Sequence, residues 1–215
     1  MSGFGLDHVW VTAEDRDEAC VRLSQLTGLP ILDGWAPDGL VRSRGVRFGN
    51  GPFLDVHTPE SGTGPAAALL SGSLAEAEAL AAREGWRCVA DRAELAPESV
   101  RPPWSLLMFK RGQGVLTHLG VIDYAADPKD WPVRPYAGKL FEFQSRRSAG
   151  ARLDRVWIGP GGAVAERQLE TLGLPSSDPE VALTAEATGV VRLEVSGGVA
   201  AGIVRVGPLQ VEVSV

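Results

Sequence analysis

The first thirty residues change their hydrophobic period half-way along. From Phe4 to Thr12 the residue types alternate with a period of two, which predicts a β-strand. One face of this strand would carry Phe4, Leu6, His8 and Trp10, and the other Asp7, Val9 and Val11. After Thr12 the apolar positions recur every three or four residues up to Leu26, and Gly28 follows them. This pattern predicts an amphipathic helix that ends in a left-handed glycine.

Short apolar stretches separated by turn residues follow the helix. They predict strands at residues 31–32, 40–43, 46–48 and 53–57. The turn from Gly49 to Pro52 would join the last two strands as a hairpin. Residues 1–60 are therefore predicted to form one β-α-β-β-β unit.

A second unit of the same kind is predicted over residues 65–124. Its helix is the clearest element, because the run LAEAEALAAR at 74–83 has high helix propensity. Ser73 suits the N-cap and Gly85 the stop. Strands are expected at 66–70, 87–90, 104–110 and 115–124. The Pro-rich stretch at 125–150 is long enough to be a flap or a connection between domains.

The chain repeats its opening near its end. LDHVWVTAEDRDEACVRLSQLTGLP starts at Leu6, and LDRVWIGPGGAVAERQLETLGLP starts at Leu153. The closing run VRVGPLQVEVSV is also similar to VRFGNGPFLDVH of the first unit. A match at both ends predicts a third unit over residues 151–215 that repeats the first. The repeat keeps a tryptophan, as Trp10 and Trp157, but exchanges His8 for Arg155.

Composition narrows the class of protein. The chain has 215 residues and a net charge of −6, which argues against nucleic acid or an anionic membrane as the main partner. No apolar run is long enough to span a bilayer, and the N-terminus lacks a basic and then apolar signal segment. Cys20 and Cys88 are too few for a disulfide framework. We therefore expect a cytoplasmic protein with reduced thiols.

Repeated units that open on LD-x-VW and close their helix on a leucine-rich GLP resemble the vicinal oxygen chelate superfamily. Its members include glyoxalase I, the extradiol dioxygenases, fosfomycin-resistance enzymes and bleomycin-binding proteins. More narrowly, the chain is similar to bacterial glyoxalase-like domain proteins. The resemblance implies an α+β fold of repeated β-α-β-β-β units, whose curled mixed sheets enclose a cleft.

The resemblance also implies metal ligands. Metal-dependent members carry a His on the first strand and a Glu on the fourth strand of each paired unit. His8 matches the first position, and Asp55 matches the second with a shorter side chain. His57 should face the same way as Asp55, since it lies two residues further along the strand. His8, Asp55 and His57 are thus the expected ligands of a divalent zinc, iron, nickel or manganese ion, with Asp55 as the catalytic carboxylate.

The other units depart from this ligand pattern. The strand expected at 66–70 has no His, and His118 stands where the second unit should have its carboxylate. Glu212, the acid candidate of the third unit, is one position out of alignment with Asp55. Arg155 either binds a carboxylate or phosphate of the ligand or, as we favour, forms a structural ion pair. Trp10 and Trp157 either line an apolar wall that binds substrate or fill the core.

Two functions remain open from the sequence. In the first, the protein is a metal-dependent lyase, isomerase or dioxygenase that acts on a small oxygen-rich molecule. In the second, it is a metal-free protein that sequesters a small molecule, like the bleomycin-binding members. The odd number of units leaves one without an internal mate, which favours a homodimer.

Overall fold

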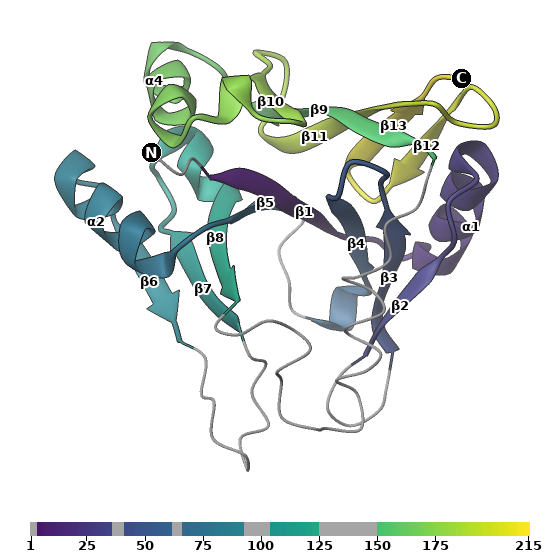
Figure 1. The fold of residues 1–215 in the computed structure, drawn as a ribbon, viewed down its shortest axis with the longest axis horizontal. Helices are drawn as coiled ribbons and strands as arrows, with labels where there is room; N and C mark the ends of the chain where they lie inside the picture. Colours follow the sequence, from purple (N-terminus) through teal and green to yellow (C-terminus); the bar gives the residue numbers. More distant parts are fainter. Residues whose placement is uncertain (1–3, 36–40, 62–65, 93–103, 125–149) are drawn as a thin grey trace.

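The computed structural model describes residues 4–35, 41–61, 66–92, 104–124 and 150–215 (Figure 1). Within these residues the chain forms three α-helices and two mixed sheets, which confirms the α+β class. The expected curl of the sheets is not seen. Instead, the larger sheet packs face to face against the smaller one. The predicted flap or connection at 125–150 lies outside the described residues, apart from Gly150.

The first unit has the predicted order of elements. Helix α1 begins after Asp15 and ends at Gly28, whose φ of 72° is the left-handed stop expected from the sequence. The two short strands predicted at 40–43 and 46–48 are one continuous strand. The elements are β1 (Gly5–Thr12), α1 (Arg16–Thr27), β2 (Leu32–Trp35), β3 (Val41–Arg47) and β4 (Phe53–His57), followed by the 3₁₀ turn η1 (Pro59–Ser61).

The second segment follows a similar order with one difference. The side chain of Ser73 accepts a hydrogen bond from the backbone N–H of Glu76, so it caps α2 as expected. The strand predicted at 115–124 is shorter, because its first half is the 3₁₀ helix η2. The elements are β5 (Ala66–Ser71), α2 (Leu74–Glu84), β6 (Cys88–Asp91), β7 (Trp104–Phe109), η2 (Gly114–His118) and β8 (Leu119–Tyr124).

These two segments share one eight-stranded sheet with the order β2-β3-β4-β1-β5-β8-β7-β6. Their first strands, β1 and β5, pair antiparallel at the centre of the sheet. On either side, β4 runs parallel to β1 and β8 runs parallel to β5. The first and second segments therefore pair with each other within one chain, a question that the sequence had left open.

The third segment forms a five-stranded sheet with the order β10-β9-β11-β13-β12. Its elements are β9 (Arg152–Gly159), α4 (Ala163–Leu172), the 3₁₀ turn η4 (Leu174–Ser176), β10 (Glu180–Leu183), β11 (Gly189–Ser196), β12 (Gly202–Val206) and β13 (Leu209–Val213). The strand–helix start matches the first segment, but β10 then pairs directly with β9, whereas β2 pairs with β3 and not with β1. The five strands instead reproduce the pairing directions of β4-β1-β5-β8-β7.

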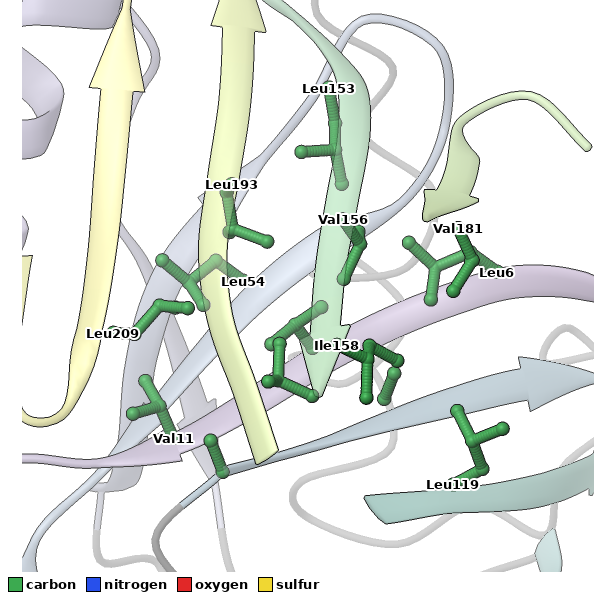
Figure 2. Close-up of a cluster of buried hydrophobic side chains, with 14 of the residues drawn as sticks. Leu6, Val11, Leu54, Leu119, Leu153, Val156, Ile158, Val181, Leu193 and Leu209 are labelled. Atoms are coloured by element: carbon green, nitrogen blue, oxygen red, sulfur yellow. The ribbon is translucent and has the colours of Figure 1, made fainter. Parts of the chain in front are cut away.

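A single core lies between the two sheets (Figure 2). From the larger sheet it receives Leu6, Val9, Val11 and Leu54, and from the smaller sheet Val156, Ile158, Leu193 and Leu209. Helices α1 and α2 pack their apolar residues into the same core near opposite ends of the larger sheet (Figure 1). The larger sheet therefore has one face committed to the core, and its other face carries the polar candidates.

A β-bulge at Asp7 decides which residues of β1 face the core. Across to β5, Leu6 pairs with Leu70 and His8 pairs with Leu69, so Asp7 is an extra residue. The prediction that Leu6 and His8 share a face is wrong, because the extra residue restarts the alternation. Leu6 joins Val9 and Val11 in the core, while Asp7 and His8 contact each other on the outer side.

The repeat carries the same bulge. Across to β11, Leu153 pairs with Val195 and Arg155 pairs with Glu194, which leaves Asp154 as the extra residue. The motif LD-x-VW thus encodes a bulge at its aspartate in both sheets. It places His8 and Arg155 at equivalent positions on the outer faces.

Candidate functional site

The outer face of the larger sheet gathers the first unit's candidate residues. In β4, Leu54 and Val56 point into the core, so Phe53, Asp55 and His57 point the other way. Strands β1 and β4 are parallel neighbours, with Trp10 level with Asp55 and His8 level with Phe53. This side is termed the polar face, and its main residues are Asp7, His8, Trp10, Ser43, Phe53, Asp55, His57 and Tyr124.

Asp55 and His57 form a close carboxylate–imidazole pair. His57 Nε2 lies 2.9 Å from Asp55 Oδ2, and both side chains are mostly buried. Burial alone raises the pKa of Asp55, but its hydrogen bond with His57 and the imidazole's charge outweigh this, so the pKa is lowered. Burial alone lowers the pKa of His57, but Asp55 outweighs it and the pKa is raised. The pair is therefore stabilised in its charged form.

His8 belongs to a second pair on the same face. Its Nδ1 lies 2.6 Å from Asp7 Oδ2, and the hydroxyl of Tyr124 donates to the same oxygen at 2.9 Å. The imidazole also stacks on Phe53, with 4.4 Å between the ring centres. Burial, together with the charge of Asp7, raises the pKa of Tyr124 well above its usual value, so its hydroxyl stays a donor. Asp7 is placed beside His8 by the bulge and is held by Tyr124 of β8, so it fixes the orientation of the His8 ring.

Stability should depend on pH through the Asp55–His57 pair. Asp55 stabilises the fold above its ordinary pKa of 3.8, and this is lost as the pH falls through the lowered folded value. His57 stabilises the fold below its ordinary pKa of 6.5, and this is lost as the pH rises through the raised folded value. The free energy of unfolding of the wild type should therefore exceed that of Asp55→Asn by the largest amount between pH 3.8 and pH 6.5, where both contributions are present. Urea unfolding of both proteins at about pH 5 and about pH 9 measures the difference.

A matched control is Glu78→Gln, which removes an exposed ion pair with Arg92. Exposed pairs contribute little, so this variant should track the wild type at both pH values. A difference between wild type and Asp55→Asn that is equal at both pH values would contradict the assignment.

The expected metal ligands do not form a metal-binding group. Among the described residues no three His, Cys, Asp or Glu side chains come together to hold an ion. Asp55 and His57 bond to each other, and His8 Nδ1 bonds to Asp7, so these donors are arranged for hydrogen bonding. Opposite Trp10 and His8, β5 presents Ala67 and Leu69, which have no donor atoms on their side chains. The residues in place do not fit the four-ligand set that the resemblance implies.

Arg155 and Trp157 lie elsewhere, on the outer face of the smaller sheet. Arg155 contacts Glu180 at 2.6 Å and Glu194 at 3.4 Å, which agrees with the structural ion pair favoured from the sequence. The indole of Trp157 donates to Glu194 at 2.7 Å, and Arg192 stacks over its ring. Because the two sheets share a core, this face points away from the polar face. The expectation that Trp10 and Trp157 line one wall is wrong, since they belong to different sheets.

The remaining acid and histidine candidates are also away from the polar face. His118 ends η2, and its ring lies 3.7 Å from the point where Gly189 would carry a Cβ. Burial lowers the pKa of His118. Glu212 accepts a hydrogen bond from Gln210 on the smaller sheet.

Sequence reasoning missed Asp7 and Tyr124. Asp7 had a signal, because the repeat keeps an aspartate at the equivalent position, Asp154. Tyr124 had none, because its bond to Asp7 joins residues 117 positions apart. The bond could be found only once β5 had brought β8 towards β1.

Comparison with known proteins rests on structure alone. No protein-family model matches the chain. No curated protein matches it either. A hypothetical protein from Staphylococcus aureus aligns with a TM-score of 0.64 and 7% identity, over 99% of each chain. The 2,3-dioxygenase LapB from Pseudomonas sp. KL28 aligns with a TM-score of 0.55 and 11% identity, over 99% of this chain and 92% of its own.

At 11% identity, the likeness to the dioxygenase is one of fold. The resemblance is confirmed at the level of the fold. Methylmalonyl-CoA epimerase from Mycobacterium tuberculosis also aligns, with a TM-score of 0.41 and 15% identity, over 57% of this chain and 89% of its own.

Among the described helices, none is both long and apolar enough to cross a bilayer.

Proposed function

We propose that the protein binds a small oxygen-bearing organic molecule on the polar face, where His57 moves a proton to or from it. The observation that carries this proposal is the placement of two carboxylate-paired imidazoles on one face. His57 is held by Asp55 on β4, and His8 by Asp7 on β1. Both lie beside aromatic rings, since His57 meets the edge of Trp10 and His8 stacks on Phe53.

A carboxylate that bonds one ring nitrogen fixes the orientation of an imidazole and favours its protonated form. His57 can then donate a proton through its other nitrogen and take it back, while Asp55 stays ionised. Asp55, the expected catalytic carboxylate, acts here as a positioning residue through His57. The second nitrogen of His8 remains to bond an oxygen of the ligand. This arrangement suits proton transfer at a carbon next to a carbonyl, as in an isomerase or a lyase.

A second candidate is binding without reaction. The aromatic rings of Trp10 and Phe53 favour it, because they offer an apolar surface beside the two imidazoles. In that case the two imidazoles only recognise the oxygens of the ligand. The two candidates share the binding face and differ in whether a proton moves.

Solvent hydrogen exchange distinguishes them. The full chain, in D₂O with and without EDTA, is incubated with small 2-hydroxy ketones and 2-oxo acids, and ¹H NMR follows the hydrogens next to the carbonyl. Exchange well above the buffer rate supports the proposal. Saturable binding without exchange supports the second candidate. Exchange that EDTA abolishes would assign the chemistry to a metal, and neither binding nor exchange in the panel would count against both candidates.

A further inference from the structure

Two neighbouring residues of the polar face each keep a buried polar atom that has no hydrogen-bond partner. These atoms are the indole Nε1 of Trp10 and the carboxylate Oδ1 of Asp55, and both are shielded from solvent. Their residues are level with each other on the parallel strands β1 and β4. His57 connects them, since it bonds the other oxygen of Asp55 and meets the ring of Trp10 edge-on at 6.3 Å. One unsatisfied donor and one unsatisfied acceptor therefore belong to neighbouring side chains that both contact His57.

In the internal repeat, the indole N–H of the equivalent tryptophan has a hydrogen-bond acceptor. Trp157 follows the same bulge on β9, and its Nε1 donates to Glu194 at 2.7 Å. Glu194 lies on β11 opposite Arg155. On the larger sheet, the residue opposite His8 is Leu69, which has no acceptor on its side chain. The N–H of Trp10 thus lacks the partner that its repeat possesses.

The carboxylates differ in the same way. On the smaller sheet, Glu180 and Glu194 are paired with Arg155. On the larger sheet, the carboxylate of Asp55 bonds His57 through Oδ2 and also has a hydrogen bond with the side chain of Ser43, while its Oδ1 has no partner. The indole of Trp157 and the carboxylates of Glu180 and Glu194 thus have side-chain partners on the smaller sheet, whereas Trp10 Nε1 and Asp55 Oδ1 have none.

An unsatisfied buried donor or acceptor destabilises the fold, and such atoms are rare in native proteins. A group that satisfies both atoms must accept from the indole N–H and donate to the carboxylate. A hydroxyl does both at once, because its oxygen accepts while its hydrogen is donated. A carbonyl oxygen can only accept, and an ammonium group can only donate.

We propose that Trp10 Nε1 and Asp55 Oδ1 together bind a hydroxyl group of the ligand. The indole N–H donates to the hydroxyl oxygen, and the hydroxyl donates to the carboxylate. This inference rests on the proposed function and narrows its substrate class to small hydroxylated molecules, such as alcohols, phenols or hydroxy acids. It also places the hydroxyl-bearing part of the ligand next to His57.

The test uses phenol and its isostere fluorobenzene, which lacks the hydroxyl. In the full chain with ¹⁵N-labelled indoles, NMR follows the Trp10 N–H signal, assigned with Trp10→Phe. Phenol should shift this signal saturably, and fluorobenzene should not. The signal of Trp157 should stay in place, because its N–H already has a partner. Trp10→Phe and Asp55→Asn should each weaken phenol binding about tenfold, whereas Trp157→Phe should leave it unchanged.

Three outcomes would overturn the inference. In the first, phenol binds saturably but the Trp10 signal does not shift. This outcome overturns the hydroxyl site and leaves the proposed function intact, because the ligand would still bind this protein. A Trp10 signal that stays at a hydrogen-bonded position, unaffected by either probe, would reveal a buried water only. Equal responses to phenol and fluorobenzene would show that the hydroxyl is not recognised. Failure of the proposed function is seen separately, in the exchange experiment.

Discussion

The His57→Gln variant is expected to exchange solvent hydrogen into a substrate about 10²- to 10⁴-fold more slowly than the wild type, the usual contribution of a positioned acid–base group. Glutamine can still donate an N–H to Asp55, so the carboxylate keeps a partner. It has no nitrogen that can be protonated and deprotonated near neutral pH. The loss should therefore appear in the rate, with the affinity for the substrate nearly kept. Exchange rates in D₂O at saturating substrate provide the measurement.

His118→Gln is the matched control for this variant. His118 lies in η2 beside Gly189, away from the polar face. The His118→Gln variant should therefore exchange solvent hydrogen into the substrate at the wild-type rate. If both variants lose exchange equally, the effect is a general loss of structure. If His57→Gln retains the wild-type rate, His57 does not move the proton and its role is at most recognition.

The Leu54→Ala variant is expected to lose about 2–5 kcal/mol of the free energy of unfolding. Leu54 is 0% exposed, and it packs in the core between the two sheets (Figure 2). Truncation removes apolar contacts with both sheets and leaves a cavity that neither sheet can close alone. Urea unfolding, with the slope compared between variants, measures the loss.

The control for Leu54→Ala is Ile203→Ala on β12. Ile203 is 55% exposed on the smaller sheet, so its truncation should change the free energy of unfolding by about 0.5 kcal/mol or less. A loss at Leu54 as small as that at Ile203 would mean that the two sheets do not depend on each other for stability. This result would contradict a hydrophobic core shared by the two sheets.

The structure explains why the internal repeat has Arg155 where the first unit has His8. Both positions follow the same bulge and lie on an outer face. Arg155 sits between Glu180 and Glu194 and closes its face with ion pairs. His8 has Phe53 and Leu69 as its cross-strand neighbours instead, and its charge partner is the bulge residue Asp7 itself. The same scaffold thus places an arginine between two glutamates on one sheet and a histidine beside its bulge aspartate on the other.

The sequence alone determined the local elements and part of the polar face. Asp55 and His57 share a side because they are two residues apart on one strand, and this holds whatever the strand packs against. The glycine stops of α1 and α2 were equally local, since a left-handed residue ends a helix through its own backbone. The pairing of the metal ligands that the resemblance implies was not local, because it depended on the residues that β5 places opposite Trp10 and His8, which are Ala67 and Leu69.

Tertiary structure decided the rest. Asp7 moved to the side of His8 because an extra residue in β1 could be recognised only against the register of β5. The bond from Tyr124 to Asp7 required β8 to lie beside β5. Arg155 and Trp157 left the site because the third segment formed its own sheet and gave its other face to the core. Periodicity assigns residues to the faces of a strand, but which face is buried depends on the partner strand and sheet.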